Sequence, residues 1–218
     1  MAIHLIRDLE NLKKELLLVG SMVEDATNKA LHALTDRRPE LAEEVIQGDR
    51  LIDDKEVEVE EDCLKLLALH QPVATDLRFV IALMKVNNDL ERVGDLAGNI
   101  ASRAKFFAEN AHIAFPEQIP TMADSTRTML RESLNALIHV DTALARKVIR
   151  DDELVDDMHK NIYAVVQDRM REVPDEIDAQ VQLLSVSRYL ERIADLATNI
   201  AEDVIFMVDG DVVRHRSW

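Results

Sequence analysis

Apolar residues recur along this chain at alternating steps of three and four positions. The first series reads Leu5, Leu9, Leu12, Leu16, Val19, Val23, Ala26, Ala30 and Ala33. This spacing places the apolar side chains on one stripe of an α-helix, because a helix completes a turn every 3.6 residues. It therefore predicts a long amphipathic helix from residue 5 to about residue 37.

The same pattern predicts five further helices, at about 39–70, 73–108, 119–139, 141–171 and 175–207. Pro39 suits a first helical turn, where its missing N–H is not needed. Pro72, Pro116 and Pro174 fall at the breaks between helices. The apolar seam of the third helix is Leu83, Val86, Leu90, Val93, Ala97, Ile100 and Ala104, and the sixth helix repeats it 100 residues later as Leu183, Val186, Leu190, Ile193, Ala197, Ile200 and Val204.

Two stretches of the chain occur twice. Leu-Glu-Arg-Val-Gly-Asp-Leu-Ala-Gly-Asn-Ile-Ala at 90–101 returns at 190–201 with nine of twelve positions identical. Residues 45–54 return at 148–157 with six of ten identical, at an offset of 103. A two-copy repeat of this length predicts an all-α fold of two tandem three-helix bundles, six long helices in all, related by an internal pseudo-two-fold. We expect a first repeat at 1–112, a linker at 113–120, a second repeat at 121–208 and a loose tail at 209–218.

Composition and charge narrow the class of function. The 218 residues include 42 Asp and Glu against 26 Lys and Arg, which gives a formal net charge of -16. Such a balance argues against nucleic acid and anionic lipid as partners. The longest apolar run, Phe79 to Met84, is too short for membrane insertion, and no signal peptide precedes it. With Cys63 as the single cysteine, the protein is expected to be soluble and cytoplasmic.

Acidic residues four positions apart occur at matched places in both halves. The pairs are Asp49/Asp53 and Glu91/Asp95, then Asp152/Asp156 and Glu191/Asp195. Like charges at this spacing destabilise a helix by roughly 0.2–0.5 kcal/mol, so their duplication suggests a compensating cation. Asn99 and Asn199 lie one turn beyond on the same ridge. If neighbouring helices pack side by side, each half gathers four carboxylates and one carboxamide, oxygen ligands that suit Fe, Mn, Mg or Ca better than Zn.

A simpler interpretation is a solvated helix face with arginine partners, for which Arg50, Arg92, Arg188 and Arg192 are close in sequence. His159 could add a ligand, although a surface histidine is the plainer interpretation, and Cys63 fits a buried thiol better than a nucleophile. No glycine-rich phosphate loop or nucleophile elbow is present. Phosphate-site chemistry is therefore not evident in the sequence itself.

Three features of the sequence are similar to one known family: the duplicated Leu-Glu-Arg-Val/Ile-x-Asp-Leu-Ala-x-Asn-Ile-Ala motif, the Leu-Ile-Asp-Asp and Leu-Val-Asp-Asp segments, and the turn at 72–78. On these features nearly the whole chain resembles the PhoU family of phosphate-uptake regulators. That resemblance implies a protein without catalytic activity, an expected non-enzyme, built of two three-helix bundles with multinuclear metal clusters on their surface. Carried over to this chain, the metal ligands are Asp49, Asp53, Glu91, Asp95, Asp152, Asp156, Glu191 and Asp195, with Asn99 and Asn199 as additions. Iron is the first expectation, with Mn, Mg, Zn or Ca as alternatives.

The resemblance also implies partners. It suggests a cytoplasmic homodimer or higher oligomer that couples the ATPase of a phosphate ABC importer to a membrane sensor histidine kinase and represses the phosphate-starvation response. Ala194 and Thr198 replace Gly94 and Gly98, so the two metal sites are expected to differ. Two alternatives are open: a carboxylate-bridged bundle that handles iron or redox chemistry, and a purely structural helical dimer.

Overall fold

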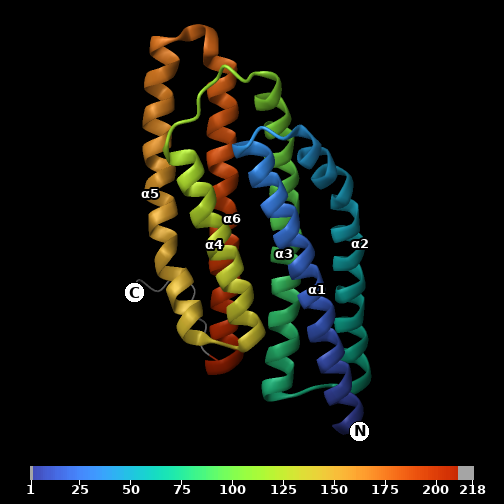
Figure 1. The fold of residues 1–218 in the computed structure, drawn as a ribbon. Helices are drawn as coiled ribbons and strands as arrows, with labels where there is room; N and C mark the ends of the chain where they lie inside the picture. Colours follow the sequence, from blue (N-terminus) through green and yellow to red (C-terminus); the bar gives the residue numbers. More distant parts are fainter. Residues whose placement is uncertain (1, 211–218) are drawn as a thin grey trace.

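The computed structural model describes residues 2–210, and this part of the chain folds into six α-helices and one short 3₁₀ helix without a strand (Figure 1). The elements are α1 (Ala2–Thr35), α2 (Pro39–His70), α3 (Ala74–Glu109), α4 (Gln118–His139), α5 (Thr142–Glu172), η1 (Pro174–Glu176) and α6 (Ile177–Asp209). The six predicted helices are confirmed, and their ends differ from the prediction by at most three residues.

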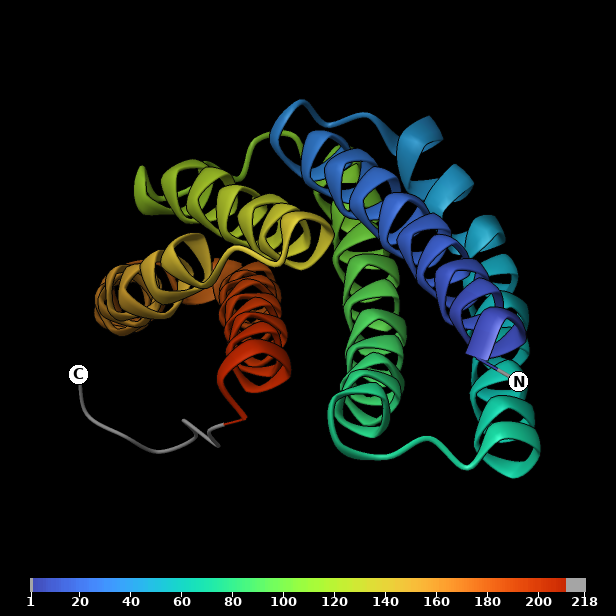
Figure 2. The same cartoon turned by 90° about the horizontal axis from the view of Figure 1, so that it is seen from below.

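The helices form two bundles side by side, α1–α3 and α4–α6, as the repeat predicts. Figures 1 and 2 show α3 and α6 together at the centre, running in opposite directions, with α2 and α5 outside them. The halves meet where α3 packs on α6 and α1 packs on α4. Because α2 packs on α3 and α5 packs on α6, the acidic pairs of each half are brought to one interhelical groove.

The core is built from the two matching seams. All seven seam residues of α3 and all seven of α6 are buried. Five of the six buried residues of α2 correspond to buried residues of α5 at an offset of 103, as in Ile52 and Val155 or Val59 and Ile162. The burial pattern therefore follows the same two offsets as the sequence repeat, and equivalent positions can be compared directly.

Arg37 ties the turn between α1 and α2 to the end of α3. Its Nη1 donates to the carbonyl oxygen of Phe107 at 2.5 Å, and its Nη2 donates to that of Ile113. Its guanidinium also lies 4.8 Å from the ring centroid of Phe115. One side chain thus satisfies a carbonyl in the last turn of α3, which the helix end leaves without a partner, and another in the connection that follows.

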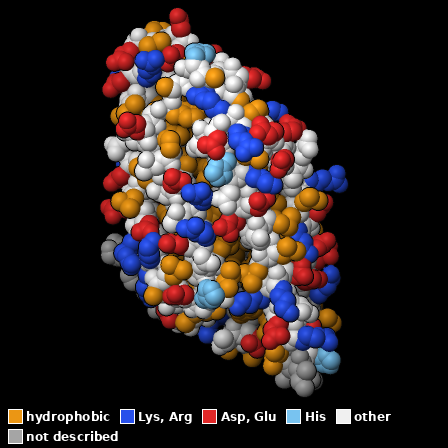
Figure 3. Space-filling model, in the orientation of Figure 1, with side chains coloured by type: hydrophobic (Ala, Val, Ile, Leu, Met, Phe, Trp, Pro, Cys, Tyr) orange, Lys and Arg blue, Asp and Glu red, His pale blue; other side chains and the backbone are white. Residues whose placement is uncertain are grey.

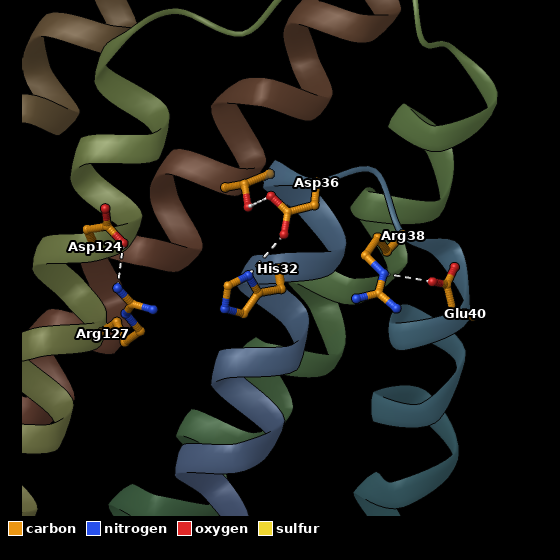
Figure 4. Close-up of polar contacts among 7 residues, drawn as sticks. His32, Asp36, Arg38, Glu40, Asp124 and Arg127 are labelled. Atoms are coloured by element: carbon orange, nitrogen blue, oxygen red, sulfur yellow. Dashed lines mark hydrogen bonds and ion pairs between the residues drawn. The ribbon is translucent and has the colours of Figure 1, made fainter.

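Short ion pairs surround the same turn (Figure 4). His32 Nδ1 lies 3.1 Å from Asp36 Oδ2, and Arg38 Nε donates to Glu40 Oε1 at 2.8 Å. Arg127 pairs with Asp124 on the neighbouring α4 at 2.8 Å. These pairs are exposed and contribute little to stability. They show basic side chains engaged with acids outside the repeated motifs.

The connection between the halves is residues 110–117, because α3 ends at Glu109 and α4 begins at Gln118, so it begins and ends three residues before the expected linker 113–120. Asp209 still belongs to α6, while residues 211–218 of the predicted tail lie outside the described residues. None of the described helices is long and apolar enough to span a bilayer. The face seen in Figure 3 intermixes acidic and basic side chains with apolar ones.

Candidate metal sites

The first candidate site lies in the groove between α2 and α3. Asp49, Asp53 and Asp95 each offer a carboxylate oxygen, and these oxygens lie within 4.8 Å of one another. Asp49 is half-buried, while the other two are exposed. Three oxygens at this separation, open to solvent on one side, suit a hard cation such as Mg²⁺, Mn²⁺ or iron.

Two glycines of α3 leave room for Asp49. A Cβ atom at Gly94 would lie 3.9 Å from Asp49 Oδ1, and one at Gly98 would lie 3.8 Å from Asp49 Oδ2. The Asp49 side chain of α2 therefore rests against bare backbone of α3. This contact places the carboxylate of Asp49 beside that of Asp95, which lies on α3 between the two glycines.

Like charges perturb the acids of the first site. Burial raises the pKa of Asp49, and the carboxylates of Asp53 and Asp95 raise it further. Burial also raises the pKa of Glu91, with added contributions from Asp95, Asp53 and Glu56. Both groups thus hold their protons more strongly than an isolated carboxyl group, which is the state that a bound cation would relieve.

The second site, between α5 and α6, is more perturbed. Burial, followed by the charges of Asp195 and Asp156, raises the pKa of Asp152 to about 7. Burial and the charges of Glu191 and Asp156 raise that of Asp195 to about 6, although this side chain is exposed on its outer side. A weak contact with the hydroxyl of Thr198 lowers the pKa of Asp152 in part. Thr198 Oγ1 and Asp152 Oδ1 are both buried, and neither has a hydrogen-bond partner of ordinary geometry.

His159 borders the second site and is held in place. Its Nδ1 lies 2.7 Å from Ser187 Oγ, and that hydroxyl donates to Met122 Sδ at 3.7 Å. The Ser187 hydroxyl has a single proton, so it either donates to Met122 Sδ and accepts from His159 Nδ1 or donates to Nδ1 itself. In the first half the equivalent contact joins Glu56 and Asn87, whose Nδ2 donates to Glu56 Oε1 at 3.0 Å.

The expected arginine partners lie elsewhere. Arg50 pairs with Asp54 at 3.8 Å, and Arg92 pairs with Asp89 at 3.4 Å. Within the described chain none of the eight predicted carboxylate ligands forms an ion pair; these are Asp49, Asp53, Glu91, Asp95, Asp152, Asp156, Glu191 and Asp195. Arg92 and Arg192 only lower the pKa values of Glu91 and Asp195 through space.

The structure thus brings three of the predicted ligands into one close group, and among the described residues the second half forms no group as tight. Glu91 contributes charge at the edge of that group, Asn99 is exposed, and Asn199 is half-buried. The replacement of Gly94 and Gly98 by Ala194 and Thr198 was visible in the sequence, where they are two of the three positions that differ between the motifs. Their place behind Asp49 of α2 was not, because it depends on the packing of two helices.

Cys63 is fully buried, and burial raises the pKa of its thiol to about 12. A thiol of this kind stays protonated at neutral pH, and only the thiolate is a nucleophile or a metal ligand. The interpretation of Cys63 as a core residue is confirmed, and the residue takes no part in either site.

Comparisons with known proteins agree on one family. The model of the PhoU domain matches residues 16–104 and 119–204. A "Phosphate-specific transport system accessory protein PhoU homolog" of Aquifex aeolicus is 39% identical over 212 residues, covering 97% of this chain and 96% of that protein. The crystal structure of PhoU from Pseudomonas aeruginosa matches with a TM-score of 0.90 at 35% identity, over 94% of this chain and 99% of that one. The phosphate transport system regulatory protein PhoU from Streptococcus pneumoniae matches with a TM-score of 0.85 at 32% identity, over 96% and 99%.

Proposed function

The chain belongs to the PhoU family, and from this we propose that it is a non-enzymatic regulator of phosphate uptake. The observation that carries the proposal is the extent of the match: relatives named as accessory or regulatory proteins of phosphate transport align with nearly the whole chain. The proposed role is cytoplasmic. The protein would couple the ATPase of a phosphate ABC importer to a membrane sensor histidine kinase, as a homodimer or higher oligomer, and repress the phosphate-starvation response.

We further propose that both acidic grooves bind metal. In the first groove Asp49, Asp53 and Asp95 would hold the cation, and in the second Asp152, Asp156, Glu191 and Asp195 would do so. In the first groove the donor set fits because three carboxylate oxygens lie within 4.8 Å of one another, and in the second groove a buried oxygen of Asp152 has no hydrogen-bond partner. None of these carboxylates has an ion-pair partner within the described chain. A bound cation would supply positive charge that neutralises the grooves. Because a ligand shifts a population only by favouring one state, metal would regulate partner binding if a partner recognises the neutralised grooves.

The regulatory role is tested in a host strain that lacks the gene and carries a reporter driven by a phosphate-starvation promoter. Deletion is expected to switch the reporter on in phosphate-rich medium, and the wild-type gene is expected to switch it off again. A reporter that ignores deletion would remove the regulatory role.

The metal sites are tested by calorimetry on chelator-stripped protein titrated with Fe²⁺, Mn²⁺, Mg²⁺ and Zn²⁺. A variant with Glu91→Ala, Asp95→Ala, Glu191→Ala and Asp195→Ala should lose the heats of binding. The control, Asp54→Asn with Asp157→Asn, removes neighbouring exposed acids that pair with Arg50 and Lys160 and should retain them. Equal heats from the wild type and the fourfold variant would refute metal binding at these residues.

The alternative of iron handling or redox chemistry is less well supported. In the helical bundles that oxidise iron, the ligands point into the bundle core. Here Asp53, Asp95 and Asp195 are exposed beside the seams. Oxygen uptake by the stripped protein with Fe²⁺ should therefore not exceed the rate of iron alone, and a catalysed rate would favour the alternative.

A further inference from the structure

A groove of about 570 Å³ lies between α5 and α6, beside the second candidate metal site. His159 and Tyr163 of α5 form one wall, and Arg188 and Arg192 of α6 form the other. Glu191 and Asp195 close the end that adjoins the metal site. The positions that line this groove have counterparts in the first half, which permits a comparison position by position.

The two halves differ most in charge at this place. At the offset of 103, His159 and Tyr163 occupy the positions of Glu56 and Glu60. At the offset of 100, Arg188 occupies the position of Asn88. Ser185, which also lines the groove, occupies the position of Lys85. The second half has therefore lost two carboxylates and one ammonium group and gained one guanidinium, while the metal-site acids are retained.

The two arginines of the groove are free to bind a ligand. Arg188 and Arg192 lie one helical turn apart on the same exposed face of α6. Neither forms an ion pair or a hydrogen bond with another described residue. Arg92, the counterpart of Arg192, pairs with Asp89 at 3.4 Å, but position 189 holds a tyrosine in place of that aspartate.

Two guanidinium groups at this spacing suit a ligand with several oxygens. Each guanidinium presents five N–H donors in a planar fork, which matches phosphate and carboxylate oxygens. The carboxylates of Glu191 and Asp195 at the end of the groove would repel an anion. A cation held by these two residues would remove the repulsion and attract the anion instead.

We propose that the groove between α5 and α6 binds a small oxyanion of the phosphate class, held by Arg188 and Arg192 next to the cation at Glu191 and Asp195. This inference rests on the proposed metal site, which sets the charge at one end of the groove. The first half, with Glu56, Glu60 and Asn88 at the equivalent positions, binds metal without the anion. The two halves would then differ in what they bind as well as in sequence.

The test is equilibrium dialysis of radiolabelled inorganic phosphate against chelator-treated and Mn²⁺-loaded protein at low ionic strength. The wild type loaded with Mn²⁺ should bind phosphate saturably. Arg188→Asn, which installs the residue of the first half, should weaken binding about tenfold or more, the effect of losing hydrogen bonds to a charged group. Arg131→Asn removes an exposed arginine of α4 outside the groove and should bind phosphate like the wild type.

Mn²⁺ binding, measured separately, should be the same in Arg188→Asn and the wild type. Absence of phosphate binding by the wild type in both forms, or equal affinity in Arg188→Asn, would overturn the inference. If Mn²⁺ does not bind but chelator-treated protein takes up phosphate through Arg188, the metal site fails and the anion site stands. Acetate, titrated in the same way, separates a phosphate-like ligand from a carboxylate, and equally tight acetate binding would overturn the phosphate assignment.

Discussion

Asp152→Asn is expected to stabilise the metal-free protein, and the gain should grow as the pH rises. Asp152 of α5 has one buried carboxylate oxygen that forms no hydrogen bond. Three other carboxylates lie near enough to raise its pKa. Ionising this group in the folded protein is therefore costly. Asparagine keeps the shape of the side chain and removes the charge.

The direction and the size of this pH effect follow from the pKa of Asp152 in the unfolded chain and in the folded chain. The unfolded chain releases the proton of Asp152 near the ordinary value of 3.8, and the folded chain releases it near 7. Between these values the folded state binds more protons, so the free energy of unfolding of the wild type falls as pH rises. The ceiling is about 4 kcal/mol at about 1.36 kcal/mol per pKa unit, and solvent access to the carboxylate reduces it to about 1–2 kcal/mol.

Urea unfolding at pH 5 and pH 8.5, in the presence of a chelator, measures the effect. The excess stability of Asp152→Asn over the wild type should be larger at pH 8.5 by about 1–2 kcal/mol. Asp157→Asn is the control, because Asp157 is exposed and pairs with Lys160 at 3.1 Å. The difference in free energy of unfolding between Asp157→Asn and the wild type should not grow in favour of the variant as pH rises. An excess for Asp152→Asn that is flat or shrinks as pH rises would refute the proposed cost of the charge.

Three further substitutions test how the sites and the fold are held. Gly98→Ala should fold, because the new Cβ would meet Asp49 Oδ2 at an ordinary 3.8 Å, and it should raise the pKa of Asp49 in a ¹³C NMR titration, because a methyl group covers the carboxylate without adding a hydroxyl; an unchanged or lower pKa would contradict this. Arg37→Met should lower the free energy of unfolding by about 1–3 kcal/mol, since it removes the donor to the carbonyls of Phe107 and Ile113, and a urea midpoint equal to the wild type would argue against that role. Asp141→Ala should cost about 1 kcal/mol in the same assay, because the Asp141 carboxylate accepts hydrogen bonds from Ala143 N and Leu144 N at 2.9 and 3.0 Å at the start of α5; no loss would mean that this cap is dispensable.

The helices and the core could be predicted from the sequence because both depend on local periodicity. The seam from Leu83 to Ala104 is buried as the spacing requires, and its copy in α6 is buried at the same positions. Arg37 could not be placed in this way. Its partners, the carbonyls of Phe107 and Ile113, lie about seventy residues away and are backbone groups without a sequence signal.

The acidic grooves were predictable in composition but not in geometry. The carboxylate ligands are the same residue types in both halves, yet only the first half brings three oxygens within 4.8 Å among the described residues. The difference comes from the facing helix, α3 or α6. Gly98 of α3 leaves space beside Asp49, whereas the side chain of Thr198 in α6 fills the equivalent space beside Asp152. Packing between helices decided this, and helix periodicity in one segment carries no information about it.

The duplication separates what both halves need from what one half has acquired. Both keep the core seams and the carboxylates, although the carboxylates repel one another and lack ion-pair partners within the described chain. A repulsive feature present in both copies is best explained by a ligand that offsets it, and a cation does so in either half. Replacement of Glu56 and Glu60 by His159 and Tyr163 leaves that ligand set intact while changing the adjacent surface. Metal binding is therefore the property expected of both halves, and whatever binds beside the metal should distinguish them.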